Sequence, residues 1–99
     1  MSAPAIHWWH MPQDLSQQEG MQRASTSLAL IAKGGQDAKI SGDEDTRRLV
    51  TSGLHAIINC VRQGDHHIFT IIIVAGNNDV ETRAIMEGIR GDMLSGVFE

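Results

Sequence analysis

The chain contains a single cysteine, Cys60, among its 99 residues. An internal disulfide is therefore excluded, and a reducing compartment suits the protein best. No stretch reaches the ~18 consecutive apolar residues that a membrane-spanning helix needs. The N-terminus also lacks a basic segment followed by a long apolar one, which is the pattern of a signal peptide. We therefore expect a cytoplasmic protein that does not enter a membrane.

Aromatic residues are scarce, with two Trp, two Phe and no Tyr, so the core must consist mainly of aliphatic residues and Met. Lysine is scarce too, with two among the eight basic residues, and twelve acids give a formal net charge of −4. Broad binding to a nucleic-acid backbone depends on many cations. We therefore do not expect nucleic acid as a partner, although Arg47, Arg48 and Arg62 would supply positive charge locally if they share a region.

An apolar segment at residues 67–75 is the clearest structural signal. It is rich in β-branched residues and ends at Gly76-Asn77-Asn78, which predicts a strand buried on both faces and followed by a turn. Such a strand needs a neighbour on each side, and the rest of the chain offers at most one short candidate. We therefore expect this strand to pair across a homo-oligomer interface, with a second copy supplying the missing neighbour.

Three helices are predicted around this strand, over residues 13–33, 43–63 and 79–95. Gly34-Gly35 is expected to end the first, and Ser41 to Glu44 matches a capping box for the second after a polar connection at 34–42. Asn78 is expected to cap the third. The apolar positions of the second helix are Leu49, Val50, Leu54, Ile57, Ile58 and Val61.

The fold class predicted from these elements is α+β, in the approximate order (β)-α-α-β-α. Residues 1–12 form an N-terminal arm bracketed by Pro4 and Pro12, either a short edge strand or an ordered coil. Residues 13–99 form a single domain. The wide apolar face of the helix at 43–63 has two interpretations: the other helices sandwich it, or part of it lies in a homo-oligomer interface. Together with the strand that lacks a partner, it favours an oligomer.

Trp8 and Trp9 stand next to each other in the arm. Neighbouring side chains of an extended segment point to opposite faces, so both cannot enter one core. We expect one to pack on the domain and the other to anchor a protein partner, because Trp is enriched among interface hot spots. The alternative is that both wrap onto the helices of the domain. A platform for stacking nucleobases is disfavoured, since such sites normally include a basic groove.

The turn at Gly76, Asn77 and Asn78 is a second candidate site. A helix N-terminus presents free backbone N–H groups, which suit an anionic ligand such as a nucleotide. Such a site would lie between subunits, with charge supplied by Arg47, Arg48 or Arg83. The segment lacks a phosphate-binding glycine motif, and Asp79 adds negative charge. A turn that satisfies only its own backbone is therefore the simpler interpretation.

Four histidines would converge on a metal if the arm paired beside the strand: His7, His10, His66 and His67. Imidazole suits zinc, copper or nickel. Adjacent histidines in a strand point to opposite faces, however, and no other metal motif accompanies them. We therefore favour surface or capping roles and expect no cofactor.

Catalytic patterns find little support. Cys60 is expected to be a small buried residue beside the apolar face of the second helix. The acids at residues 43–45 are explained by a helix start. The sequence thus favours a non-catalytic, homo-oligomeric protein-binding module, an adaptor, inhibitor or regulatory subunit, that acts through its aromatic arm and acidic surface. The alternative is a binder of a small anionic ligand or nucleotide at the turn 76–79.

Overall fold

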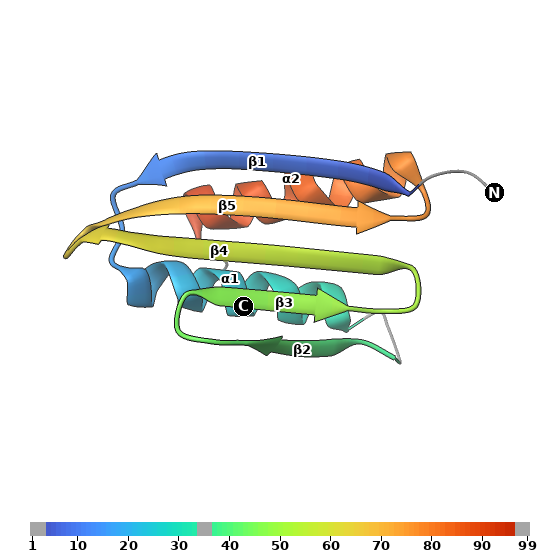
Figure 1. The fold of residues 1–99 in the computed structure, drawn as a ribbon, viewed down its shortest axis with the longest axis horizontal. Coiled ribbons are helices and arrows are strands. Elements are labelled where there is room, and N and C mark those ends of the chain that lie inside the picture. Colours follow the sequence, from blue (N-terminus) through green and yellow to red (C-terminus); the bar gives the residue numbers. More distant parts are fainter. Residues whose placement is uncertain (1–3, 34–36, 97–99) are drawn as a thin grey trace.

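A computed structural model describes residues 4–33 and 37–96 of the chain (Figure 1). It is a small α+β domain with five strands and two helices. The elements follow one another as β1 (Ala5–Gln13), α1 (Gln17–Ala32), β2 (Lys39–Gly42), β3 (Thr46–Val50), β4 (Leu54–Gly64), β5 (His67–Gly76) and α2 (Asp79–Ser95).

The strands form one antiparallel sheet in the order β1-β5-β4-β3-β2. β5 is bounded on one side by β1 and on the other by β4, so both of its edges are paired within the chain. The expectation that this strand pairs across a homo-oligomer interface is therefore wrong. The N-terminal arm supplies the missing neighbour, because Ala5–Gln13 pairs with β5 along its whole length.

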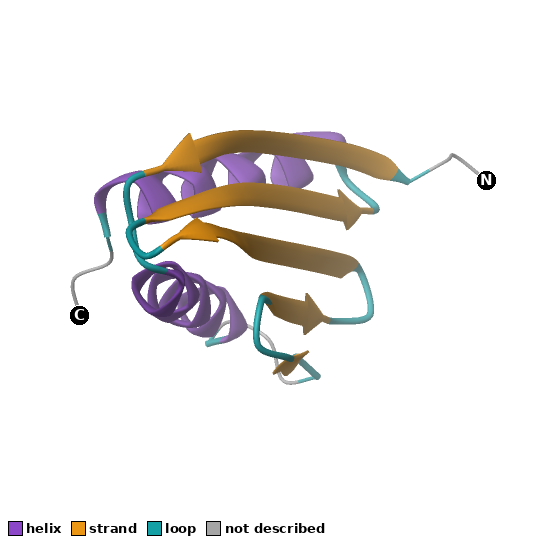
Figure 2. Cartoon of the chain, turned by 60° about the vertical axis from the view of Figure 1, so that its left-hand side comes forward, coloured by secondary structure: helices purple, strands orange, loops and turns teal. Residues whose placement is uncertain are grey.

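Both helices lie on the same face of the sheet, with α2 behind β1 and β5 and α1 behind β4 and β3 (Figures 1 and 2). The buried core lies between this helical layer and the sheet. Its fully buried large apolar side chains come from both helices and three strands: Leu28, Leu49, Ile58, Ile68, Ile72, Val74, Ile89 and Met93. As expected from the scarcity of aromatics, the core is aliphatic with Met.

The helices follow local signals in the sequence. α2 covers the predicted range, and the side chain of Asn78 caps it by accepting a hydrogen bond from the Glu81 N–H at 2.9 Å. α1 is four residues shorter at its start than predicted. Ser16 is its N-cap and forms a capping box with Glu19. The predicted end of this helix at Gly34-Gly35 lies outside the described residues.

The predicted helix at 43–63 is wrong, because this segment forms the hairpin of β3 and β4. The capping box expected at Ser41 does not exist either, since Lys39–Gly42 is strand β2 and residues 43–45 lie in the turn to β3. The order (β)-α-α-β-α is accordingly replaced by β-α-β-β-β-β-α. Neither helix in the part of the chain that the structure describes has the length and apolar character to cross a membrane.

Candidate functional site

One face of the sheet carries no helix. Side chains alternate along each strand, and those that point away from the helices form what we call the open face. Its residues are Ile6, Trp8, His10 and Pro12 on β1; Phe69, Ile71, Ile73 and Ala75 on β5; His55, Ile57, Asn59 and Val61 on β4; Thr46, Arg48 and Val50 on β3; and Lys39 and Ser41 on β2.

The open face presents large apolar side chains to solvent. Trp8 is 62% exposed and Ile6 is 59% exposed, while Ile73 and Val50 are each almost 40% exposed. Single exposed apolar residues are ordinary on protein surfaces, whereas a contiguous patch of them marks an interaction site. Trp8 is directly paired with Ile73, and Ile6 lies two residues from Trp8 on the same face of β1, so these three form such a patch. Val50 lies apart from them on β3, beyond Ala75 and His55.

The register of the sheet places four residues of this patch in one row. Trp8 is paired with Ile73, Ile73 with Ile57, and Ile57 with Arg48. Directly paired residues project from the same face at short separation. A strip of indole, two isoleucines and one guanidinium therefore crosses the sheet from β1 to β3.

Trp8 also belongs to a cluster of three aromatic rings on the open face. The rings of Trp8 and His10 are stacked with centroids 5.2 Å apart and planes 4° from parallel. The ring of Phe69 lies 5.5 Å from that of His10. The stacking against His10 limits the rotamer freedom of the indole, which a partner would otherwise have to remove on binding.

Charge is distributed unevenly around the open face. None of the five strands contains Asp or Glu, although the chain has twelve acids. The titratable residues of the open face are Lys39, Arg48, His10 and His55. The strand-end turns are acidic instead, with Asp14, residues 43–45 and Asp65 at one end and Asp79 and Glu81 at the other. The acids near residues 43 and 79 thus lie at opposite ends of the sheet and do not form a single acidic surface.

Trp9 takes the opposite side of β1 from Trp8. It is half-buried and packs against the hydrophobic core. The prediction that the two tryptophans divide between the core and the surface is therefore confirmed, and Trp8 is the exposed member of the pair.

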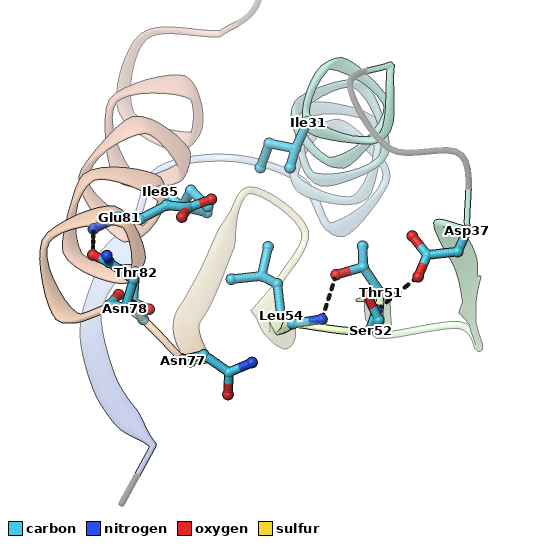
Figure 3. Close-up of a pocket in the computed structure, with 11 residues that line it drawn as sticks. Ile31, Asp37, Thr51, Ser52, Leu54, Asn77, Asn78, Glu81, Thr82 and Ile85 are labelled. Carbon is cyan, nitrogen blue, oxygen red and sulfur yellow. Dashed lines mark hydrogen bonds between the residues drawn. The ribbon is translucent and has the colours of Figure 1, made fainter. Parts of the chain in front are cut away.

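The turn at 76–79 borders a cleft of about 500 Å³. Figure 3 shows its lining, which combines the apolar residues Ile31, Leu54 and Ile85 with the amides of Asn77 and Asn78 and the carboxylates of Asp37 and Glu81. The Ser52 backbone N–H donates to Asp37 at 2.9 Å, and this bond lowers the pKa of the carboxyl group. The charged side chains at this cleft are therefore acids, and an anionic ligand would meet repulsion.

The arginines proposed for that ligand are dispersed. Arg47 faces α1, where its Nε donates to the Ser25 hydroxyl at 3.0 Å. Arg83 pairs with Glu87 on α2 at 3.4 Å. Arg48 lies on the open face, and none of the three lines the cleft.

The four histidines are not brought together. His7 Nε2 lies 2.8 Å from Oδ1 of Asp79 at one end of the sheet, and His67 Nδ1 lies 2.9 Å from Oδ1 of Asp14 at the other. His10 lies on the open face, and His66 is exposed in the β4–β5 turn. No three His, Cys, Asp or Glu side chains within residues 4–33 and 37–96 are grouped to hold a metal ion.

Cys60 is fully buried, as predicted, but it lies on strand β4 rather than on a helix. Burial raises the pKa of its thiol to about 11, so it is not an activated nucleophile.

Most of the open face was missed at the level of sequence. The sequence predicts that one of Trp8 and Trp9 is exposed, but it places Ile73 in a strand buried on both faces and Ile57 on the apolar face of a helix. The available signal was the β-branched composition of residues 46–61 and the Ser52-Gly53 pair between two apolar runs, which together favour a hairpin. No protein-family model matches the sequence, and no curated protein is significantly similar to it, so its function has to be argued from these residues.

Proposed function

We propose that this protein is a non-catalytic protein-binding module that docks its open face against another folded protein surface. One observation carries the proposal: Trp8, 62% exposed, lies in a continuous apolar row on a sheet face that contains no carboxylate. An adaptor, inhibitor or regulatory subunit that acts by occupying a surface needs such a patch and no catalytic group. The single buried thiol suits a reducing compartment such as the cytoplasm.

The energetics support Trp8 as the anchor. A Trp side chain buries 150–250 Å² when it is fully covered. Covering its exposed part would contribute about 3 kcal/mol at 25 cal/mol per Å². This is the range of an interface hot spot. Ile6 and Ile73 flank the indole and would exclude water from it.

The acids at the strand ends add a kinetic element to the proposal. They flank the apolar centre without entering it, which is the usual arrangement of an interface with an apolar core and a polar rim. Charges at a rim change the rate of encounter more than the final affinity. A partner with basic residues around an apolar patch would therefore be captured faster, and this advantage would weaken with added salt.

The test is photo-crosslinking in cells that make the full-length chain. Ile6 is replaced by benzoylphenylalanine, since an exposed position accepts a larger aromatic side chain without disturbing the core. The matched control carries the same group at Val80, which is 78% exposed on α2 and lies away from the open face. We expect a protein adduct at position 6 that is absent at position 80 and is abolished by Trp8→Asp. Equal labelling at both positions, or none at position 6, would contradict the proposal.

A further inference from the structure

We propose that the protein covering the open face is a second copy of this chain, packed sheet against sheet about a two-fold axis that sets Trp8 of each copy over Arg48 of the other. This inference rests on the proposed function, because it names the occupant of the same surface. Three observations carry it: the extent of the apolar strands, the absence of acids from them, and the order of residues along one row.

The size of the open face matches a dimer interface. β1, β5, β4 and β3 carry its apolar side chains, whereas β2 contributes Lys39 and Ser41. Four strands at ~4.8 Å spacing and about nine residues at ~3.3 Å rise give roughly 600 Å² in projection. The corrugation of the side chains increases the accessible area, and a standard interface buries about 800 Å² from each partner. Two sheets packed face to face enclose a core of aliphatic side chains about 10 Å thick.

When a surface binds a second copy of itself, it must not bury charged groups that find no partner on the identical surface. The strands contain no Asp or Glu, so no carboxylate would be buried without a partner. Among the described residues, Arg48 forms no ion pair of its own. The Asp43 carboxylate lies within electrostatic range of the Arg48 guanidinium, but no ion pair in this part of the chain holds the side chain, which can therefore contact a group on another molecule.

The position of the two-fold axis follows from the register. The middle of the four apolar-bearing strands lies between β5 and β4. A two-fold axis there, lying between the two sheets and parallel to the strands, places β1 of one copy opposite β3 of the other, and β5 opposite β4. Because Trp8, Ile73, Ile57 and Arg48 share one row, Ile73 then faces Ile57 and Trp8 faces Arg48.

The alternative two-fold axis runs across the strands and would place each strand opposite the same strand of the second copy. Arg48 would then approach the second Arg48, and two cations would be buried together at a cost. With the axis along the strands, the guanidinium instead approaches an indole, and the ring face that His10 does not cover is available for a cation–π contact. Electrostatics therefore selects the arrangement that pairs Trp8 with Arg48.

The test is sedimentation velocity on the untagged full chain over a wide concentration range. We expect a dimer whose dissociation constant rises at least thirtyfold in Trp8→Ala, as for a hot-spot residue, and about tenfold in Arg48→Ala. The control is Val80→Ala, an exposed apolar residue on α2, which should leave the constant unchanged. Circular dichroism establishes that each variant is folded, which is expected because Trp8, Arg48 and Val80 are all exposed.

A swapped pair makes the test specific. The double variant W8R/R48W places the arginine on β1 and the indole on β3, so the same two-fold arrangement restores both contacts. We expect W8R/R48W to dimerise more tightly than the single variants W8R and R48W, each of which breaks both contacts. If both single variants weaken the dimer but the swap restores nothing, the proposed pairing is overturned.

Two further results separate this inference from the proposed function. A chain that stays monomeric at all concentrations, yet crosslinks from position 6 to a different protein, would overturn self-association and leave the protein-binding proposal intact. A dimer unaffected by Trp8→Ala would use another surface and would also overturn the inference. Salt provides a second discriminator: the acidic turns of the two copies would lie near each other, so added salt should strengthen a self-dimer and weaken binding to a basic partner.

Discussion

Trp8 and Ile73 are directly paired across β1 and β5, and they are 62% and 39% exposed on the same face of the sheet. On the opposite face, the next residues of these strands, Trp9 and Ile72, pack into the core. The edge strand β1 and its neighbour β5 therefore carry apolar side chains on both faces of the sheet, although helices cover only one of these faces. A domain of this size gains no stability from leaving Trp8 in water, and the proposed binding role rests on this exposure.

The two tryptophans should differ sharply in their contribution to the stability of the monomer. Trp8→Ala should change the free energy of unfolding by less than about 1 kcal/mol, because the indole is mostly in solvent. Trp9→Ala should cost about 3 kcal/mol, since it removes a large side chain from the edge of the core. Urea unfolding, measured at concentrations where the protein sediments as a monomer, tests the contrast. Equal losses in the two variants would contradict the assignment of Trp8 to the surface.

The open face also explains why the β3–β4 hairpin was mistaken for a helix. Strands are recognised from alternation between apolar and polar residues, which requires one face to be polar. Here Ile58 faces the helices while Ile57 and Val61 lie on the open face, so apolar residues occur on both sides. With Leu54 and Val50 they fall three, four and seven residues apart, which imitates a helix.

Local sequence signals predicted the structure better than the periodicity of apolar residues did. The bounds of α2 and the capping role of Asn78 were predictable, because a short side chain at the N-cap has one local partner. The division between Trp8 and Trp9 followed from the geometry of any extended segment. The sequence offers the arm as one candidate edge strand beside residues 67–75, but not its pairing along the whole of β5, because that pairing joins residues far apart in the chain and depends on where α1 directs it.

Two glycines that look alike in the sequence should respond oppositely to substitution by Ala. A Cβ at Gly20 on α1 would lie 2.5 Å from Cδ1 of Ile68 and 3.3 Å from Sγ of Cys60, so either the buried Ile68 side chain or the helix would have to shift. A Cβ at Gly88 on α2 would meet no atom within 4 Å. Gly88→Ala should therefore stabilise the protein by about 0.5–1 kcal/mol through helix propensity, and Gly20→Ala should destabilise it. Thermal unfolding of both variants provides the measurement, and stabilisation by both would show that α1 does not approach the sheet closely.

The buried amide of Gln13 should be important for stability. Its Oε1 accepts from the Thr70 hydroxyl at 2.6 Å, and its Nε2 donates to the Met93 carbonyl at 2.8 Å, which ties β1 to β5 and to the end of α2. Gln13→Leu leaves the buried Thr70 hydroxyl without its partner, at a cost of about 1–3 kcal/mol, whereas the Met93 carbonyl still accepts from Arg23 at 2.8 Å. Gln63→Leu, at an exposed position on β4, is the control. If Gln13→Leu is as stable as the wild type in urea, these bonds do not hold the strand in place.

Cys60 should be unreactive in the folded protein and should make stability fall at alkaline pH. Burial raises the pKa of its thiol from 9.0 to about 11, so the folded state keeps a proton that the unfolded state releases. The contribution to stability is thus fully present below pH 9.0 and is lost as the pH rises toward about 11, up to about 3 kcal/mol in total.

The measurement for Cys60 is labelling with a thiol-specific disulfide reagent at pH 8, which should occur in denaturant and not in the native protein. In parallel, the free energy of unfolding of the wild type is compared with that of Cys60→Ala between pH 8 and pH 11. The difference between the two should narrow with rising pH, because only the wild type loses the contribution of a protonated thiol. Rapid labelling of the native protein would mean that α1 opens to expose β4, and a constant difference would mean that the thiol titrates alike in both states.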